Sequence, residues 1–501
     1  MRISELTKMY SELFKLSRKL NRLFFYKVLF LLLLNTSVSP QSNGDIYRKY
    51  VELFPTAKNV PSLAAGISKE NKIVFIGSAG YINLENNVPA TTKSVYRLAS
   101  ISKSITAVAI LQLFEAGKLN LDEDVSKYVK YFPKKKWPVS IRRILNHTSG
   151  IRTYRNDEEF NNTKNFPDIK SSVFYFANDS LEHQPGTRYL YSTLSYNLLA
   201  AVIEEVSGKS YNNYIREKIF NPAGMSSAYL DFHQNIIPNR ASGYQKNKLR
   251  LMENASLADL TIKFPGGGIA TSIEDLIKFG NALLNNTLIQ AATLDSALQP
   301  TKLLSGKIIQ YGLGFDTRKD EFGNLYFGHS GGGTGFTSNL IIYPDDKIVA
   351  AYLLNIRDRN LENPAQLFAW HLMGEKTLEM PKKPLSDWML TLIDKDSIES
   401  ILNTFDSFRE DSSNVFLTGV TELKNFGYDL LAYKKYTEAI AVFSKLIDSD
   451  PALVDGYIGL GDTYLNDDNR GLALRNYRRV LRIDPNNEYA KRMIKSIENK
   501  N

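Results

Sequence analysis

The spacing of apolar and polar residues divides most of the chain into a strand-rich start, a helical middle and a strand-rich end. Two runs rich in β-branched residues, SLAAGIS and KIVFIGSAGYI, flank a short polar turn at 69–71. Apolar residues at helical spacing follow at 100–117, 190–206 and 273–284. Strand-like runs then return in YFGHSGG, GFTSNLIIYP and KIVAAYLLN. This order predicts one antiparallel sheet built from both ends of the segment, with helices packed on it.

Beyond a proline- and lysine-rich stretch at 380–384, the pattern becomes helical and repeats with a period of 34 residues. Five positions recur: Gly427, Leu431, Ala439, Phe443 and Pro451 return as Gly461, Leu465, Ala473, Tyr477 and Pro485. This spacing resembles the tetratricopeptide repeat, a pair of antiparallel helices, with Tyr457 in the place of the usual tryptophan. Two units leave apolar faces open, so we expect flanking helices at 398–405 and 488–497.

The N-terminal residues have the charge, length and order of an export signal. Basic residues at 15–27 precede the apolar run Val28–Leu34, and the small residues Ser37 and Ser39 follow. The apolar run is shorter than the roughly 20 residues that span a bilayer. We therefore expect an exported, periplasmic protein cleaved near residue 40. The alternatives are a retained N-terminal membrane anchor and a buried helix.

The composition excludes several kinds of chemistry. The chain has 501 residues, of which 43% are hydrophobic and 23% charged, as in folded proteins with a large core. It has no cysteine, so disulfides, thiolate metal sites and cysteine nucleophiles are excluded. Its five scattered histidines form no zinc-binding pair, and we expect neither a metal nor a cofactor. Residues 1–40 hold seven lysines and arginines against two glutamates; the rest of the net charge of +9 is too dilute to indicate nucleic-acid binding.

The sequence SISK at 100–103 places a serine and a lysine one turn apart at the start of a strongly apolar helix. Side chains at i and i+3 share a face, so Lys103 can reach the Ser100 hydroxyl. The helix N-terminus also favours a developing oxyanion. Lysine acts as a base only when neutral, and burial lowers the pKa of an amine. The pattern therefore predicts that Lys103 activates Ser100 as a nucleophile, against the alternative of a capping serine beside a solvated lysine.

Six stretches occur in an order that is more specific than any one of them: LASISKSITAVAILQLFEAGKLNLDEDV, ILNHTSGI, QPGTRYLYSTLSYNLLAAVIEEVSG, NPAGM, PGGGIATSIEDLIKF and GHSGGGTGF. Together they resemble the serine β-lactamase and penicillin-binding-protein-like hydrolases, nearest the class C and esterase branch, over residues 50–370. The resemblance implies an α+β fold in which an antiparallel β-sheet is flanked by helices, with a central helical region. An all-α tetratricopeptide-repeat domain would follow it.

These patterns divide the chain into four parts. We expect a signal peptide or anchor at 1–40, a β-lactamase-like serine hydrolase domain at 45–375, a linker at 376–395 and a helical repeat region at 396–501, with repeats at about 422–455 and 456–489.

The resemblance implies a role for the motif Tyr191-Ser192-Thr193, where the family usually has Tyr-x-Asn. Tyr191 would share proton transfer with Lys103. Thr193 lacks the amide that commonly contacts the substrate and the lysine, which puts peptide-like substrate binding in doubt more than catalysis. The chain has no Glu-x-x-Leu-Asn segment of the class A type, so Tyr191 and Lys103 would serve both half-reactions. Which of the two takes the first proton stays open.

The resemblance also implies a role for His329-Ser330-Gly331, which replaces the Lys-Thr-Gly of penicillin-recognising members. His329 and Gly331 would bind the substrate, with His329 near the leaving group. The backbone N–H of Gly332 would pair with that of Ser100 as the oxyanion hole. His147, in NHTSG, matches the family and is expected to be structural.

The expected function is therefore that of an exported serine hydrolase acting on an ester or amide, with a D-amino-acid peptide or a β-lactam among the candidate substrates. One rival is an α/β-hydrolase, because residues 328–332 fit Gly-x-Ser-x-Gly. That elbow needs a helix after the serine and a later histidine, whereas glycines follow here and only His371 lies beyond. A second rival is a non-catalytic peptidoglycan- or partner-binding protein that uses its repeats to bind another protein.

Overall fold

The computed structural model describes residues 43–247, 252–358, 361–410 and 416–498. The expected signal at 1–40 lies outside these residues. Among the described residues, no helix is both long enough and apolar enough to cross a membrane.

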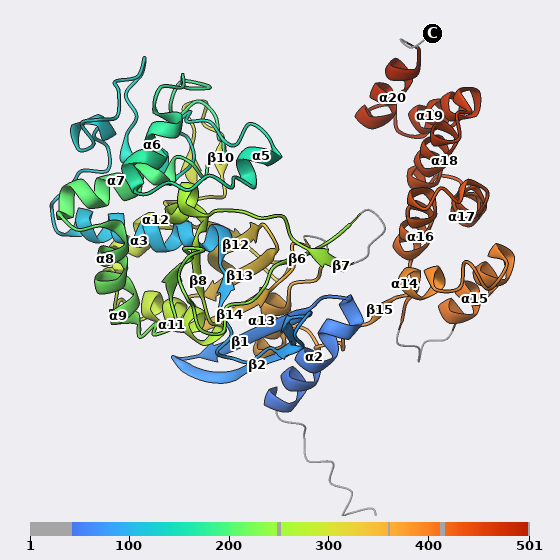
Figure 1. The fold of residues 1–501 in the computed structure, drawn as a ribbon, viewed down its shortest axis with the longest axis horizontal. Helices are drawn as coiled ribbons and strands as arrows, with labels where there is room; N and C mark the ends of the chain where they lie inside the picture. The colour runs from blue at the N-terminus through green and yellow to red at the C-terminus, as the bar shows by residue number, and fades with distance from the viewer. Residues whose placement is uncertain (1–42, 248–251, 359–360, 411–415, 499–501) are drawn as a thin grey trace, which may run out of the picture. The chain divides into compact units, whose positions relative to one another are not determined.

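A seven-stranded antiparallel sheet organises residues 62–354 (Figure 1). Its order is β11 (Asp316–Lys319), β12 (Leu325–Gly333), β13 (Phe336–Tyr343), β14 (Ile348–Leu354), β1 (Ser62–Lys69), β2 (Lys72–Asn83) and β3 (Val88–Pro89). Strand β1 pairs with β14, with Gly66 opposite Ala351. Glu70 and Asn71 form the expected turn between β1 and β2 and have φ of 50° and 66°. The sheet is thus built from both ends of the domain, as predicted.

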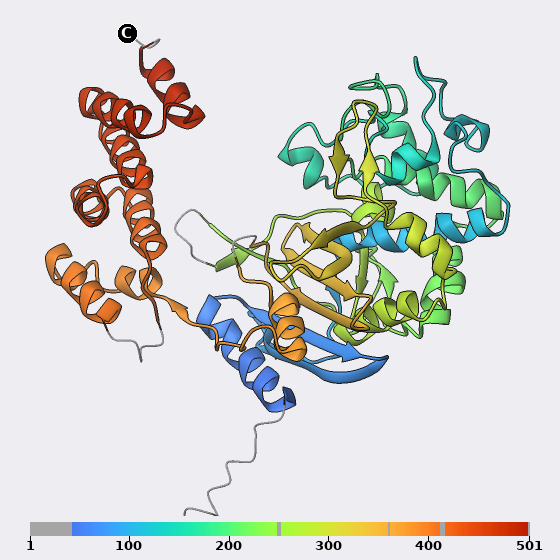
Figure 2. The same ribbon diagram turned by 180° about the vertical axis from the view of Figure 1, so that it is seen from behind.

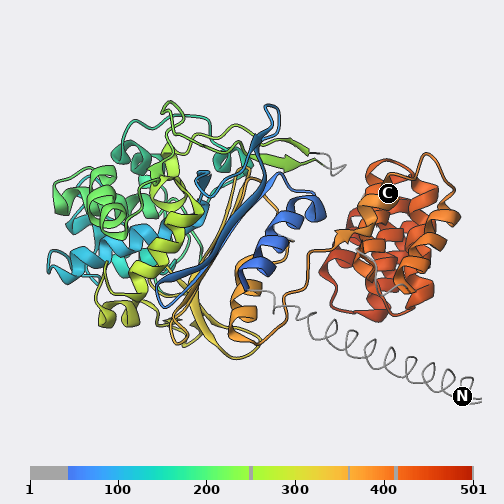
Figure 3. The same ribbon diagram turned by 90° about the horizontal axis from the view of Figure 1, so that it is seen from below.

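Helices cover both faces of this sheet, which Figure 3 shows nearly edge-on. Helix α11 (Ile273–Leu284) packs on one face against β1 and β14. Helices α2 (Asn43–Lys58) and α13 (Pro364–Met373) cover the other, where the rings of Tyr47 and Phe368 lie 4.6 Å apart. The predicted α+β fold is confirmed.

Apart from α11, the helices that lie in the sequence between β3 and β11 form the central helical region, which gathers to one side of the sheet (Figure 2). Its helices are α3 (Ser102–Glu115), α4 (Ile141–Leu145), α5 (Asp157–Phe160), α6 (Ile169–Ala177), α7 (Tyr196–Ser207), α8 (Tyr211–Ile215), α9 (Asn221–Ala223), α10 (Phe264–Gly267) and α12 (Ala291–Ala297). Short strands accompany them: β4 (Tyr96–Arg97), β5 (Tyr229–Leu230), β6 (Tyr244–Lys246), β7 (Met252–Asn254), β8 (Ile269–Thr271), β9 (Thr301–Lys302) and β10 (Ile308–Ile309).

Helix α3 is the central helix of the domain. Every side chain from Ser102 to Leu111 is buried, as expected of a helix that is apolar on nearly every face. A short 3₁₀ turn, Ala99–Ile101, precedes it, so the predicted helix begins with a tighter turn than an α-helix. Gly117, with φ of 66°, follows the helix end and supplies the expected stop.

Helix α7 begins at Tyr196 rather than at Leu190, so the predicted helix 190–206 is wrong over its first six residues. The Ser195 N–H donates to Ser192 Oγ at 3.2 Å, and that hydroxyl donates to the Arg152 carbonyl at 2.5 Å. These hydrogen bonds hold the segment before α7 as a loop. Apolar spacing misled the prediction because Leu194 in this loop is buried as completely as a core helix residue.

The C-terminal residues fold into consecutive packed helices. They are α14 (Leu385–Leu390), α15 (Ile398–Glu410), α16 (Val420–Ala432), α17 (Tyr436–Ser449), α18 (Val454–Asn466), α19 (Arg470–Ile483) and α20 (Glu488–Glu498), with the short strands β15 (Lys383–Pro384) and β16 (Phe416–Leu417). Helices α15 and α20 lie where flanking helices were expected. Helix α14 lies inside the segment expected to be a linker, and its Leu385 and Met389 are buried in the helical core.

Equivalent positions of the two expected repeats pack alike. A Cβ added to Gly427 would come within 2.7 Å of the Phe443 ring, and one added to Gly461 within 2.6 Å of the Tyr477 ring. In each pair, a glycine of the first helix admits an aromatic ring of the second. The repeated sequence therefore corresponds to repeated packing.

The contact between α11 and the sheet can be tested at Gly280. An alanine Cβ there would lie 2.4 Å from Val349 Cγ1. We expect Gly280→Ala to lower the free energy of unfolding by about 1–3 kcal/mol through overpacking, despite the better helix propensity of alanine. Urea unfolding measures this. In the double variant with Val349→Ala the combined loss should be smaller than the sum of the single losses; strict additivity would contradict the contact.

Candidate active site

Ser100 lies in the 3₁₀ turn that leads into α3, and β12 passes close beneath this turn. Ala99 has φ of 46°, a left-handed conformation that costs a residue other than glycine about 1–2 kcal/mol. A Cβ at Gly331 would lie 2.2 Å from the Leu98 carbonyl oxygen and 2.1 Å from Ser338 Oγ. The structure thus places Gly331 in a packing contact that only glycine allows, and this contact holds the serine turn against the sheet.

Lys103 is completely buried, and three oxygens surround its amine. Nζ lies 3.2 Å from Ser100 Oγ, 3.1 Å from Thr193 Oγ1 and 2.6 Å from the Gly266 carbonyl oxygen. Burial lowers the pKa of Lys103 well below 10.5, and the charge of Lys263 lowers it further. A neutral amine has two N–H groups and one lone pair. If the N–H groups donate to Thr193 and Gly266, the lone pair faces the Ser100 hydroxyl.

Thr193 keeps one of the contacts that its substitution for asparagine was expected to lose. Its hydroxyl accepts a hydrogen bond from Lys103, so the lysine contact survives without the amide. A Cβ at Gly266 would come 2.7 Å from Thr193 Cγ2, so glycine is needed where these segments meet. The lysine contact is therefore kept at this position by a hydroxyl.

Strands β4 and β8 bring the Gly266 carbonyl to the lysine. Strand β4 comes just before Ser100 in the sequence and β8 comes just after Gly266. Because the two strands pair, these two segments lie side by side. The Leu98 N–H donates to the Ile269 carbonyl at 2.8 Å, and the Ile269 N–H donates to Ser102 Oγ at 3.1 Å. These hydrogen bonds fix the glycine-rich loop to the start of α3, although the two segments are far apart in the sequence.

Tyr191 forms a wall of the site over the lysine. The Lys103 amine lies 4.7 Å from the centroid of the Tyr191 ring. Burial raises the pKa of Tyr191 well above 10.0, although a hydrogen bond with Ser100 opposes this increase. The phenol is therefore protonated at neutral pH. It can donate a proton, whereas the buried amine can accept one.

His147 supports Tyr191 from within the core. Its ring lies 4.2 Å from the Tyr191 ring at an interplanar angle of 38°, and its Nδ1 accepts the Ser192 N–H at 3.2 Å. Burial lowers the pKa of His147 well below 6.5, and the charge of Lys103 adds to the effect. A neutral imidazole in this place holds the loop that carries Tyr191. The geometry agrees with the structural role expected for His147.

His329 lies near Tyr191 and does not line the pocket at Ser100. Its ring centroid is 6.2 Å from that of Tyr191. Nδ1 lies 2.6 Å from the Ser330 carbonyl oxygen and therefore carries the proton, while the Tyr311 hydroxyl donates to Nε2 across 3.0 Å. Burial lowers the pKa of His329 to about 4, so the imidazole is neutral. Tyr311 was not singled out from the sequence.

A pocket of about 30 Å³ opens at Ser100. Of the residues named from the sequence, the structure brings Ser100, Thr193 and Gly332 together here. The sequence analysis missed five other lining residues: Arg97, Tyr154, Phe160, Leu260 and Lys263. None of them belongs to a recognised motif, although Lys263 stands two residues before PGGG.

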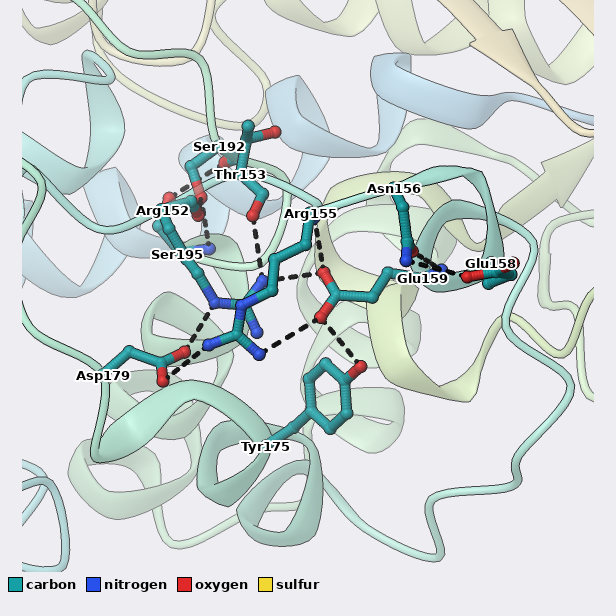
Figure 4. A network of polar contacts seen from close by, with 10 residues as sticks. All are labelled: Arg152, Thr153, Arg155, Asn156, Glu158, Glu159, Tyr175, Asp179, Ser192 and Ser195. Atoms are coloured by element: carbon teal, nitrogen blue, oxygen red, sulfur yellow. Dashed lines mark hydrogen bonds and ion pairs between the residues drawn. The ribbon is translucent and has the colours of Figure 1, made fainter.

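A buried ion-pair network holds the loop that supplies Tyr154 and Phe160 (Figure 4). Arg152 Nη1 pairs with Glu159 at 2.8 Å, and Arg152 Nε pairs with Asp179 at 2.5 Å. The Arg152 carbonyl accepts the Ser192 hydroxyl, which lies between the two site residues Tyr191 and Thr193. The network therefore positions two walls of the pocket, although it does not itself touch Ser100.

Comparison with known proteins agrees with this geometry. The family model described as Beta-lactamase matches residues 47–372. Human serine beta-lactamase-like protein LACTB, mitochondrial, is 30% identical over 379 residues, which cover 57% of this chain and 69% of that protein. Penicillin-binding protein 4* of Bacillus subtilis (strain 168) is 29% identical over 328 residues, covering 62% of this chain and 72% of that protein. The fold and the comparisons define a serine hydrolase of the β-lactamase and penicillin-binding-protein type.

Among solved structures, the octameric penicillin-binding protein homologue from Pyrococcus abyssi is 26% identical with a TM-score of 0.57, over 68% of this chain and 79% of that one. D-amino acid amidase from Ochrobactrum anthropi SV3 has a TM-score of 0.58 at 20% identity, over 67% of this chain and 99% of that one, which shows the fold alone. The chain belongs to the beta-lactamase family.

Removing Arg152 should destabilise the fold and disturb the pocket. Arg152→Met leaves the carboxylate of Glu159 buried without its main partner, a change that costs about 3–5 kcal/mol in comparable buried pairs. Denaturant unfolding measures this loss. Arg155→Met is the matched control, because Arg155 is 59% exposed and pairs with the same two carboxylates. Its loss should stay within about 1 kcal/mol; equal losses in the two variants would contradict the account.

The same network gives a pH dependence of stability. Burial opposes ionisation of Glu159, but hydrogen bonds from Arg155 N–H and Arg152 outweigh it, and the pKa of Glu159 is lowered. The pKa of Asp179 is lowered in the same way, because Arg152 and Arg155 outweigh burial. A lowered carboxyl pKa stabilises the folded state above the unfolded value of about 4, and this contribution is lost as the pH falls below it. As the pH is lowered, the free energy of unfolding should therefore decrease less in Arg152→Met than in the native protein.

Proposed function

We propose that the protein is an exported serine hydrolase that cleaves an ester or amide, such as a D-amino-acid peptide bond, through an acyl-enzyme on Ser100. The observation that carries the proposal is the buried amine of Lys103, 3.2 Å from Ser100 Oγ with its pKa lowered. The N-terminal sequence supports export. Membership of the beta-lactamase family supports hydrolysis.

In acylation, Lys103 takes the proton of Ser100 while the serine oxygen attacks the substrate carbonyl. The backbone N–H groups of Ser100 and Gly332 stabilise the oxyanion. Tyr191 gives its proton to the departing oxygen or nitrogen, and the proton held by Lys103 replaces it. The opposite pKa shifts of the two groups support this order, with the amine as the first base and the phenol as the acid.

In deacylation, the same two groups work on water. The neutral Lys103 and Tyr191 pair takes a proton from the attacking water, and Ser100 recovers its proton as the acyl group leaves. His147 and His329 stay neutral and transfer no protons, and the His147 ring packs against the Tyr191 ring at 4.2 Å between centroids.

We also propose that helices α16–α19 are two tetratricopeptide repeats that bind a partner protein. The matched packing of Gly427 on Phe443 and of Gly461 on Tyr477 supports the repeat assignment.

Ser100 should be the residue that a serine-directed fluorophosphonate probe modifies. We expect mass spectrometry to find the adduct on the Ser100 peptide, and Ser100→Ala to abolish labelling. Ser330→Ala is the matched control, because Ser330 is exposed and is the serine of the rival Gly-x-Ser-x-Gly reading. Labelling that survives in Ser100→Ala and disappears in Ser330→Ala would overturn the proposal.

Lys103 should act as the base only in its neutral form. Lys103→Met is expected to slow acylation by about 10²–10⁴-fold, the usual contribution of a general base. Lys103→Arg should be equally slow, because arginine keeps its charge at any working pH. In the native protein, acylation should fall at acid pH as the amine becomes protonated. Stopped-flow labelling measures these rates, and near-native acylation in Lys103→Arg would exclude the amine as the base.

A further inference from the structure

A second pocket, of about 160 Å³, lies where α6, α7 and α8 meet the 3₁₀ turn Thr261–Lys263, and we call it the α6–α8 pocket. Among the described residues, none lines both this pocket and the one at Ser100. The proposed mechanism uses none of the residues of the α6–α8 pocket. Its apolar walls are Phe166, Ile169, Tyr211, Leu230, Phe232 and Phe264.

The apolar part of the α6–α8 pocket has the size of one aromatic ring. A cavity of about 150 Å³ with apolar walls holds one benzene molecule. The rings of Phe232 and Phe264 lie nearly edge to face, with centroids 4.4 Å apart and planes at 65°. Their edges and faces are suitable partners for a further ring.

The wall around Tyr211 is formed before any ligand arrives. Tyr211 is 1% exposed, and its hydroxyl lies 2.7 Å from Thr106 Oγ1 on α3. The Thr106 hydroxyl in turn donates to the Pro265 carbonyl at 2.6 Å. These hydrogen bonds fix the ring, so that a ligand loses little affinity to the ordering of this wall.

One side of the α6–α8 pocket is acidic, because Glu204 and Asp168 both line it. Glu204 accepts the Tyr211 N–H at 2.8 Å, and Asp168 accepts the Ser171 N–H at 2.7 Å. Neither of these donors carries a charge. In the described parts of the chain, neither carboxylate has an ion-pair partner. Burial raises the pKa of Glu204, and the charges of Asp168 and Glu205 add to this although the Tyr211 N–H opposes it.

The lysines near the α6–α8 pocket do not neutralise it. Lys209 precedes the pocket residue Ser210, but it is paired with Glu217. Lys164 is exposed, and its amine lies 5.7 Å from the centroid of the Phe166 ring. The whole chain has a net charge of +9, so the acidic character of this pocket is local and runs against the overall charge.

The combination of a carboxylate with aromatic walls selects one class of ligand. Aromatic faces attract a cation, and a carboxylate pairs with it through charge-assisted hydrogen bonds. A neutral ligand would leave Glu204 without a partner, and an anion would be repelled. In the part of the chain that the structure describes, no group of three or more acidic or histidine side chains could hold a metal ion.

We propose that the α6–α8 pocket binds a small organic cation, with an aromatic or cyclic ring among Phe232, Phe264 and Tyr211 and an ammonium group beside Glu204. The site lies apart from the residues of the hydrolytic reaction, so this inference does not rest on the proposed function.

Two probes of nearly the same shape test the proposal. They are 4-fluorobenzylamine, which is a cation at neutral pH, and 4-fluorobenzyl alcohol, which is neutral. Titration of each with the full-length protein, followed by ¹⁹F NMR relaxation of the probe, gives its dissociation constant. We expect the amine to bind saturably and about 10-fold more tightly than the alcohol, because only the amine forms a charged pair with Glu204.

A change at Glu204 assigns this preference to one carboxylate. In Glu204→Gln the affinity ratio of amine to alcohol should fall to about one, because the amide keeps an oxygen for the Tyr211 N–H but has no charge. Glu205→Gln is the matched control, because Glu205 is the next residue of α7 and is exposed. Its ratio should change by less than about 2-fold. An unchanged ratio in Glu204→Gln would overturn the proposal.

A change at Asn212 shows where the probes bind. Asn212 lines the α6–α8 pocket, and the side chain of Asn212→Trp should fill it and abolish binding of both probes. Asn213→Trp is the matched control, because Asn213 is exposed on the same helix, and both probes should bind it as they bind the native protein. Circular dichroism checks that the variants are folded. If Asn212→Trp is not, the comparison of Glu204→Gln with Glu205→Gln decides.

Three other results would contradict the proposal: no saturable binding of the amine, equal affinities for amine and alcohol, or native binding in folded Asn212→Trp. None of these measurements involves Ser100. Failure here therefore leaves the hydrolase proposal in place, and failure of serine labelling leaves this inference in place.

Discussion

The site depends on the complete burial of one amine among uncharged oxygens. Lys103 Nζ contacts a carbonyl and two hydroxyls, and among the described residues it has no carboxylate partner. Desolvation of the charged form then makes the neutral amine the stable one. The surrounding fold maintains this condition: α3 is buried on all sides, the β4–β8 pair brings in the Gly266 carbonyl, and Gly331 lets β12 pack under the serine turn. A carboxylate beside the amine would restore its charge and remove the base.

The groups around this amine are kept neutral by the same desolvation. Tyr191 stays a phenol and His147 and His329 stay uncharged, because burial raises the pKa of the first and lowers those of the other two. Proton transfer can therefore occur between groups that are neutral at rest. Lys263 differs from them, because burial lowers its pKa only to about 7.

Local sequence patterns predicted helices and strands well where the buried residues recur at one regular spacing, that of a helix or that of a strand. Helix α11 spans the predicted 273–284, and β12, β13 and β14 lie where the late strand-like runs were found. The spacing of Ser100 and Lys103 predicted their contact, because i and i+3 geometry is local. The loop at Tyr191 was predicted as helix, since its buried Leu194 fits the apolar period and the Ser192 hydrogen bonds that break the helix involve Arg152, 40 residues away. Arg97, Phe160, Lys263 and Tyr311 were missed because long-range packing alone brings them to the site.

The central claim concerns the charge of Lys103, and it can be measured directly. In protein labelled with ¹³C at lysine Cε, the Lys103 signal is assigned by its absence in Lys103→Met and followed over a pH titration by NMR. The account predicts that this signal has the chemical shift of a neutral amine at pH 7 and titrates well below the ordinary value of 10.5. A Lys103 signal that titrates near 10.5, with the other lysines, would contradict it.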